Sequence, residues 1–523
     1  MARSLRFLLF VLTPLTLLAA FTGCPPRLAP TQGAVALWGD HIGGIGNDST
    51  TAVALAPDGS TVVAGWFASM ATLGAEQSNP VHIASAGGRD AYVARYDTSG
   101  KVDWAYPLGG PKTDSATAVI VQSNGTLLLA GNFQDTAVIQ GGNESRTIVQ
   151  SEGPPGVDSV FLARFSMDGA LLETWKLPDG ITRVSAMAPL PDGGYYMSGE
   201  FTAEVELAVV GGSKLLLPSN GEDAFEEVFL ARFNRNDNLL WAAAATGPFV
   251  DRARGISVTS DGGCYVAGSF GHAITFNAFG ESPQTLESHG GAHLSHGDAF
   301  LARYNPDGQF LWARRMGGPD QFTVFEKANA VAALSDDSCY VTGSYRRGMA
   351  IFGEGEQRER TLENPADETF FLAHFRENGD LDWVRDMDAR LPTAGQSVVV
   401  LEDDTCVAAG FLESIAVLET GLESNVALFT DTFPIGIDLF LARYNTAGEL
   451  QSVRRVGGAG SADTRLAYQP AGPEAIDAKQ AAGTLALCGQ FWRRARFAFG
   501  LPEEYTLLST AEWDGFAARI LVE

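Results

Sequence analysis

The chain has 523 residues, too many for one ordinary core, and 45% of them are apolar against 19% charged, so it is globular rather than disordered. Lys and Arg number 36 and Asp and Glu 62, which gives a formal net charge of −26. This balance argues against a surface for nucleic acid or anionic lipid, because both need net basic patches.

The first residues have the features of a secretory signal peptide. Arg3 and Arg6 precede an apolar run at 7–21, which is shorter than the roughly 20 residues that span a bilayer. We therefore predict that residues 1–23 are a cleaved leader and that the mature chain is exported.

The leader ends at Thr22-Gly23-Cys24, which resembles the bacterial lipoprotein box. The resemblance implies that Cys24 carries lipid and that 24–33 is an extended tether, at most about 30 Å long. Pro25 stands where an Asp would favour the inner membrane, and by the same analogy it favours the outer membrane. The alternative is ordinary secretory cleavage nearby, with Cys24 incidental.

From residue 34 onward one theme is repeated. Its first half is a pair of apolar runs joined by a tight turn, as in AVALAPDGSTVVAGWF at 52–67, and each copy ends near a marker glycine. Apolar residues that alternate with small or polar ones around Asp-Gly or Asn-Gly predict an antiparallel hairpin. The marker glycines of the seven copies are Gly65, Gly131, Gly199, Gly268, Gly343, Gly410 and Gly489.

The second half of the theme is another hairpin, as in AYVARYDTSGKVDW at 91–104. Two hairpins per copy predict a four-stranded antiparallel sheet, and the lack of sustained 3.6-residue amphipathicity predicts almost no helix. The stretch between the two hairpins is too long for a tight turn, so we expect a decorating hairpin or long loop there, on one face. The lead aromatic residues of the second half are Tyr92, Phe161, Phe229, Phe300, Phe371, Phe440 and Phe516.

The two ends of the repeat region complete each other. The last copy stops at 516–523 without its Trp strand, and residues 34–38 supply one instead. Such a split repeat ties the first sheet to the last and removes free edges. The sequence therefore predicts an all-β fold over 34–523: a seven-bladed β-propeller of four-stranded antiparallel blades, closed by the N-terminal strand.

Both hairpins, DG-x-x-x-V-A-G-x-F and D-A-F-L-A-R-Y-x-x-x-G-x-x-x-W-A, resemble the bacterial seven-bladed β-propeller repeats of cell-surface lipoproteins. The resemblance covers 34–523 and implies the fold and an extracytoplasmic location. It implies no activity, because that family is largely of unassigned role. The seventh copy departs from the pattern by lacking the Asp-Gly turn, and an extra stretch at 457–474 is expected to protrude as a loop.

A basic residue recurs in the second half of every copy, five or six residues after an acid. One interpretation is a charged ring around a channel. The other, which a sevenfold feature favours, is a brace between strand and loop in each blade. The basic residues are Arg95, Arg164, Arg232, Arg303, His374, Arg443 and Arg519, and the acids are Asp90, Asp158, Glu226, Asp298, Glu368, Asp438 and Asp514.

Histidines gather in the fourth copy. His289, His293 and His296, followed by Asp298, offer imidazole and carboxylate ligands of the kind that zinc accepts. The segment is glycine-rich, so convergence of the ligands on a helix cannot be assumed, and a solvated loop is the alternative. A divalent-metal site at these four residues is the hypothesis, and we expect no other cofactor.

Four cysteines lie close to the marker glycines. Export permits disulfides, yet equivalent positions in adjacent blades do not approach to within the roughly 7 Å that a disulfide requires between Cα atoms. Buried free thiols are the favoured interpretation, with disulfides as the alternative. The four are Cys264, Cys339, Cys406 and Cys488.

The sequence contains no G-x-S-x-G or H-E-x-x-H motif, no phosphate-binding loop and no C-x-x-C pair. This favours a non-catalytic binding or scaffolding protein of the cell envelope. Its partners would be the membrane, through lipid on Cys24, and envelope proteins or polysaccharide, with no nucleic acid. The alternative is an extracytoplasmic lyase or hydrolase at the mouth of the propeller channel. An enzyme needs polar residues that break the repeat in one or two blades.

Overall fold

The structure is a computed structural model of the chain. It describes residues 27–28, 36–153, 156–208, 214–219, 225–278, 280, 282–289, 297–318, 326–413, 415–418, 426–430, 437–457, 479–481, 484–492, 494–497, 505–509 and 513–521. Within these ranges the regular elements are all strands, as the sequence predicts. The same ranges hold no helix long and apolar enough to cross a membrane.

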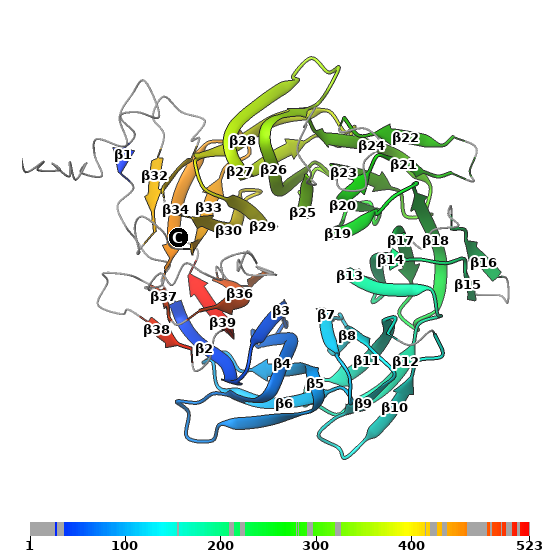
Figure 1. Ribbon diagram of the computed structural model, residues 1–523, viewed down its shortest axis with the longest axis vertical. Coiled ribbons are helices and arrows are strands. Elements are labelled where there is room, and N and C mark those ends of the chain that lie inside the picture. The colour runs from blue at the N-terminus through cyan, green and yellow to red at the C-terminus, as the bar shows by residue number, and fades with distance from the viewer. Residues whose placement is uncertain are drawn as a thin grey trace, which may run out of the picture.

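Antiparallel sets of four strands recur along the chain and are arranged around a common centre (Figure 1). The described residues form seven such sets, which we number in chain order. The innermost strands of sets one to seven are β3 (Asp48–Leu55), β7 (Ser115–Val121), β13 (Ile181–Pro189), β19 (Arg252–Val258), β25 (Lys327–Ala333), β29 (Thr393–Val400) and β35 (Lys479–Ala481). The second strands are β4 (Thr61–Leu73), β8 (Thr126–Phe133), β14 (Tyr195–Phe201), β20 (Cys264–Gly271), β26 (Cys339–Phe352), β30 (Cys406–Glu413) and β36 (Thr484–Phe491).

The third strands, which carry the lead aromatic residues, are β5 (Val81–Tyr96), β11 (Ser159–Ser166), β17 (Glu227–Phe233), β23 (Gly297–Tyr304), β27 (Arg360–Phe375), β33 (Ile437–Tyr444) and β39 (Asp514–Leu521). The outer strands are β6 (Val102–Leu108), β12 (Leu171–Lys176), β18 (Leu239–Thr246), β24 (Phe310–Gly317), β28 (Leu381–Ala389), β34 (Leu450–Val456) and, for set seven, β2 (Ala36–Ile45). The pairing of β2 with β39 thus joins residues 36–42 to 515–520, as the split repeat predicts.

The expected decorating hairpins are present between the second and third strands. In sets one and five they extend β4 with β5 and β26 with β27. Several pair with the outer strand of the preceding set, as Thr246 of β18 does with Thr275 of β21. This pairing merges neighbouring sets into larger sheets. The separate hairpins are β9 (Thr136–Gln140) with β10 (Arg146–Gln150), β15 (Val205–Ala208) with β16 (Lys214–Leu217), β21 (Ala273–Phe276) with β22 (Gln284–Glu287), β31 (Ile415–Leu418) with β32 (Val426–Phe429), and β37 (Arg494–Phe497) with β38 (Tyr505–Leu508).

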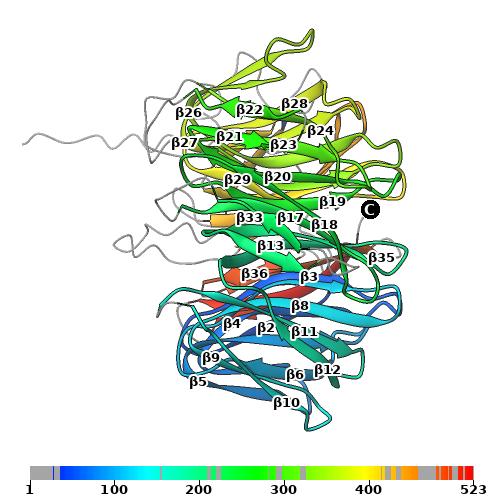
Figure 2. The same cartoon turned by 90° about the vertical axis from the view of Figure 1, so that its right-hand side faces the viewer.

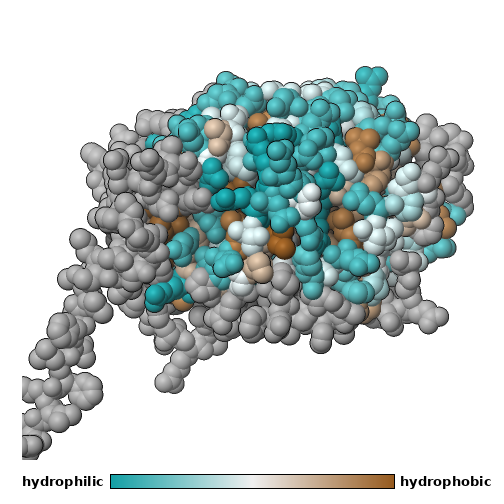
Figure 3. Space-filling model, turned by 90° about the horizontal axis from the view of Figure 1, so that it is seen from above, coloured by the Kyte–Doolittle hydropathy of each residue, from teal (hydrophilic) through white to brown (hydrophobic). Residues whose placement is uncertain are grey.

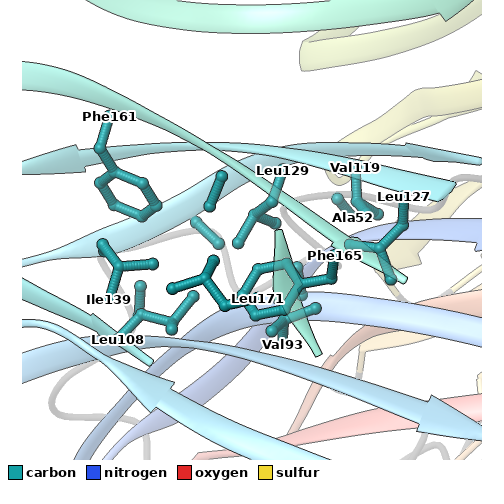
Figure 4. Close-up of a cluster of buried hydrophobic side chains, with 14 of the residues drawn as sticks. Ala52, Val93, Leu108, Val119, Leu127, Leu129, Ile139, Phe161, Phe165 and Leu171 are labelled. Atoms are coloured by element: carbon teal, nitrogen blue, oxygen red, sulfur yellow. The ribbon is translucent and has the colours of Figure 1, made fainter. Parts of the chain in front are cut away.

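Hydrophobic cores lie between adjacent sets. Figure 4 shows one of them, in which Ala52 and Val93 of set one pack with Leu129 and Phe161 of set two. Equivalent clusters join sets two and three, three and four, four and five, five and six, six and seven, and seven and one. The sheets are therefore stabilised by burial against each other rather than by a single central core.

The marker glycines of sets one to six each lie opposite a bulge in the inner strand. In set four, Ala253 pairs with Gly268 and Gly255 with Ala267, so Arg254 is the extra, bulged residue. A Cβ on Gly268 would collide with the backbone carbonyl of Arg252, which explains the glycine.

Figure 2 shows the sheets from the side, where the strands run across the thickness of the disc.

In most sets a tryptophan of the outer strand contacts the next set, whereas set six has Val453 at that position. The indole of Trp241 donates to the carbonyl of Pro306 at 2.9 Å, and that of Trp383 to Thr446 at 2.9 Å. Trp38 of β2 packs against Gly100 of set one without such a hydrogen bond, and a Cβ at Gly100 would lie only 2.5 Å from the indole. Within the predicted tether, β1 (Arg27–Leu28) pairs in parallel with β32.

Candidate functional site

Two of the four predicted metal ligands are described, and an arginine lies between them. The Arg315 guanidinium donates to Asp298 Oδ2 at 2.9 Å and contacts the His289 ring and Glu354. Burial raises the pKa of Asp298 to about 6 and lowers that of His289. His293 and His296 lie outside the described residues. Among those that are described, no three His, Cys, Asp or Glu side chains are grouped to hold a metal ion.

Other predictions also fall outside the described ranges. Cys24, the leader at 1–23 and nearly all of the insertion at 457–474 are among them. Lipidation and export therefore stay predictions.

The recurring basic residues do brace the sheets, but their partners differ from those expected. Arg95 pairs with Asp58 of its own set at 2.7 Å rather than with Asp90, which accepts from the backbone NH of Ala86 at 2.8 Å. The acid and the basic residue lie at opposite ends of the third strand, and this is why they do not meet. Arg303 likewise reaches the carbonyl of Glu377 in the next set at 2.8 Å. These contacts favour the structural interpretation over a charged ring.

The fifth set replaces this arginine by a histidine and thereby forms a Ser-His-Asp array. His374 Nε2 lies 3.0 Å from Ser338 Oγ, and its Nδ1 lies 3.4 Å from Asp382 Oδ2. Ser338 is only 4% exposed, and its hydroxyl also donates to Asp336 at 2.5 Å. The same hydroxyl position is bonded by the arginine in other sets, as Ser60 is by Arg95. The array is a variant of the brace and lacks an accessible nucleophile.

The four cysteines near the marker glycines are free and buried, which confirms the favoured interpretation. Burial raises the pKa of the Cys264, Cys339 and Cys406 thiols, so these three are poor nucleophiles and poor metal ligands.

The feature that breaks the repeat lies at the start of the inner strands. The inner-strand residue just before the one that pairs with the marker glycine is small or hydroxylated in sets one, two and six but basic in sets three, four and five. These residues are Ser49, Ser115, Ala394 and, in the basic group, Arg183, Arg252 and Lys327. The bulged residue is polar and uncharged except in set four, where it is Arg254.

Acids and a further arginine complete what we call the inner charged cluster. Arg252 pairs with Glu226 at 2.6 Å, and Arg346 with Glu368 at 3.6 Å. The carboxylate of Glu200 accepts from Ser185 Oγ at 3.0 Å. The members of the cluster are Arg183, Glu200, Glu226, Arg252, Arg254, Lys327, Arg346, Glu368 and Glu413.

The inner strands bring this cluster together. Gly255, next to the bulged Arg254, approaches β25 so closely that a Cβ there would lie 2.9 Å from the Cα of Ala330. Ser257 of β19 also accepts from the NH of Ala333 of β25 at 3.0 Å. β13, β19 and β25 face the centre of the ring in Figure 1. Charges from three sets therefore converge at one end of neighbouring inner strands.

The cluster has an excess of positive charge. The ion pairs within 4 Å among the described residues of the cluster are those of Arg252 and Arg346, whereas Arg183, Arg254 and Lys327 interact with Glu200 and Glu368 only at longer range. Burial and then the neighbouring Arg252 lower the pKa of Arg254 to about 10, and burial also lowers that of Lys327. Burial raises the pKa of Glu200 to about 7, with Glu226 adding to the effect. This cluster is the candidate functional site.

Sequence reasoning missed this site although a signal was present. The apolar runs that define the copies begin after the basic residues in GITRVSAM, VDRARGIS and FEKANAVA. Comparing the residues just before each run would have revealed the charge in three adjacent copies.

Outside the site, Figure 3 shows one edge of the disc, where hydrophilic residues predominate and apolar ones form small, separate spots. Large exposed apolar side chains such as Leu172, Leu240 and Leu311 occupy equivalent places on outer strands of successive sets.

No protein-family model matches the sequence. The chain is 20% identical over 426 residues to an uncharacterized WD repeat-containing protein of Acanthamoeba polyphaga mimivirus, covering 72% of this chain and 30% of that protein. It is 30% identical over 133 residues to the regulatory protein FlaEY of Caulobacter vibrioides, covering 25% of this chain and 13% of that protein. The chain thus spans less than a third of either relative. The likeness to a WD repeat-containing protein agrees with a repeat protein of the propeller kind.

Two solved structures resemble the fold only distantly. A streptogramin B lyase matches with a TM-score of 0.29 at 9% identity, and the match covers 71% of this chain and 94% of the lyase chain. A xylan β-1,4-xylosidase from Bacillus halodurans has a TM-score of 0.27 at 9% identity and covers 95% of this chain and 97% of its own. At these scores neither structure bears on activity.

Proposed function

We propose that the seven sets are the blades of a closed seven-bladed β-propeller, lipid-anchored through Cys24 at the outer membrane, which serves as a binding or scaffolding protein of the cell envelope. The shared cores between all neighbouring sets support the ring. The pairing of β2 with β39 and the packing of Trp38 on Gly100 support its closure. The Thr-Gly-Cys sequence supports the anchor.

The observation that carries a binding function is the inner charged cluster. A ring needs its cores, turns and braces in every blade, but it has no structural need for unpaired cations in three of them. The five cations of the cluster outnumber its four acids, Glu200, Glu226, Glu368 and Glu413, and an anionic ligand would compensate this excess. We therefore place the binding site at the end of β13, β19 and β25 where Arg183, Arg252 and Lys327 lie.

The anchor is tested by expressing the full chain and its Cys24→Ala variant in a Gram-negative host. The wild-type chain should fractionate with the outer membrane and enter the detergent phase, whereas the variant should be released as a water-soluble form. Wild-type protein that stays water-soluble after export would refute the anchor without affecting the binding site.

The binding function is tested by thermal shift of the full chain against envelope polysaccharides, peptidoglycan fragments and their component sugars. A ligand at about 100 times its Kd should add roughly 2.7 kcal/mol of stability, which such an assay detects. Stabilisation without turnover supports a binding protein.

A lyase or hydrolase is the second candidate, and Glu200 is the observation that favours it. Glu200 is itself 2% exposed, but its cross-strand neighbour Arg183 is exposed, and burial raises the pKa of the Glu200 carboxyl to about 7, where a general acid or base works best. Product formed by the wild-type chain but not by Glu200→Gln would establish this candidate.

A further inference from the structure

The inner charged cluster combines two kinds of ligand-binding group. Its cations Arg183, Arg254 and Lys327 have no ion-pair partner within 4 Å among the described residues. Beside them lie hydroxyls and carboxylates, such as Ser269, which is 3.5 Å from Arg254 Nε, and Glu368, which accepts from Ser344 at 2.6 Å.

The cations fit a carboxylate. Arginine presents paired N–H groups that match the two oxygens of a carboxylate, and lysine adds a compact charge. The bulge carries Arg254 in place of the neutral Asn329 of the next set, which instead donates to the carbonyl of Gly395 at 2.8 Å. None of the described residues gives Arg254 such a backbone acceptor, so its guanidinium is available to a ligand in a way that the neutral bulge residue is not.

The acids restrict the class of anion. Glu226 and Glu368 would repel a densely phosphorylated polymer, and the net charge of −26 would repel it further. The same carboxylates accept hydrogen bonds from ligand hydroxyl groups. A ligand with one carboxylate and several hydroxyls per unit satisfies both halves of the cluster.

We propose that the inner charged cluster binds a sugar acid, either free or as a unit of an acidic polysaccharide, with its carboxylate on Arg183, Arg254 and Lys327 and its hydroxyls on the neighbouring serines and glutamates. This inference rests on the proposed binding function and names the chemical class of its ligand.

The test is isothermal titration of the full chain in detergent with galacturonate, trigalacturonate, galactose and inorganic phosphate. We expect galacturonate units to bind and galactose and phosphate not to bind. Tighter binding of the trimer than of the monomer would identify a polysaccharide as the ligand, and equal binding would identify a free sugar acid.

Arg254→Gln and Lys327→Gln should each weaken binding about tenfold or more, and Arg254→Lys should recover part of the loss. Arg146→Gln, an exposed arginine on β10, is the matched control and should bind as the wild type does.

The results separate the two proposals. If galactose bound as tightly as galacturonate and Arg254→Gln weakened both, the sugar-acid class would be wrong and the site would stand. If galacturonate bound but neither Arg254→Gln nor Lys327→Gln altered its affinity, the site itself would be wrong. No binding of galacturonate or its trimer at millimolar concentration, by a chain whose thermal unfolding is cooperative, would also overturn the sugar-acid class.

Discussion

The two ends of the sheets differ in how strictly they repeat. At the end that carries the tight turns, arginine braces and Trp–Gly contacts recur in set after set, as in Trp104 on Gly169 and Trp312 on Gly379. At the opposite end, where the inner strands begin, sets one and two have Ser49 and Ser115 while the next set has Arg183.

The difference separates architecture from function. Contacts that tie one set to the next must be made at every junction, so selection for stability repeats them. A ligand meets the ring from one side and contacts a few sets only, so its site must depart from the repeat. The turn end should therefore control stability, and the start of the inner strands should control binding.

The largest effect is expected from crowding a Trp–Gly contact. Gly100 has a φ of +85° and faces Trp38, whereas Gly125 has a φ of +78° with open space around a Cβ. Alanine at either position should lower the free energy of unfolding by about 1 kcal/mol, because its Cβ disfavours a left-handed backbone. At Gly100 the Cβ also collides with the indole, so the total loss there should be about 3 kcal/mol. Urea unfolding of both variants measures the difference. Equal losses would show that the Trp38 contact contributes nothing to stability.

The next largest effect on stability is expected from replacing arginines at opposite ends of the sheets. The Arg303 side chain is 4% exposed and bonds the carbonyl of Glu377, so Arg303→Met should cost about 2 kcal/mol. Arg254→Met removes a cation held among like charges and should leave the free energy of unfolding within about 0.5 kcal/mol or raise it. Chemical denaturation monitored by tryptophan fluorescence measures both variants. A larger loss for Arg254→Met would make the cluster structural.

A smaller effect is expected from pH. Burial raises the pKa of Asp48 and Asp114 at the start of sets one and two to about 7, like that of Glu200. Between the unfolded value near 4 and this folded value, the unfolded chain loses its protons first, so stability falls as pH rises from about 4 to 7 and then levels off. The Tm should drop by roughly 2–5 °C between pH 5 and pH 8.

The variant Asp114→Asn serves as the control for that pH profile. It removes one titrating carboxyl and should flatten the decline, even though it weakens the caps that Asp114 makes to the NH groups of Gly110 and Gln134. A stability that rises from pH 5 to pH 8 in the wild type would contradict the raised pKa values.

The same comparison explains what the sequence could predict. Alternation, Asp-Gly turns and marker glycines depend on neighbours within a hairpin, so the four-stranded sets and even the pairing of β2 with β39 were accessible from spacing alone. The partners of Arg95 and Arg303 were not, because strand length carries each acid to the far end of the sheet. The inner charged cluster was not accessible either, because Arg183 and Lys327 lie far apart along the chain and are brought to the same end of the sheets only by β13, β19 and β25.

The smallest effect concerns the thiols, and it tests how rigid the turn end is. Cys264, Cys339 and Cys406 begin their second strands directly after the tight turns and are fully buried, while Cys488 lies toward the other end of its strand. In the Cys24→Ala variant, reductant should leave the Tm unchanged within about 1 °C, because no disulfide is lost. Alkylation followed by mass spectrometry should label no thiol in the folded chain and all four in urea.

The rates of labelling compare the two ends of the sheets. If the three turn-end thiols react only as fast as the whole chain unfolds while Cys488 reacts sooner, the turn end is the more rigid end. Rapid labelling of Cys264 in the folded chain would reverse that order and break the division of roles between the two ends.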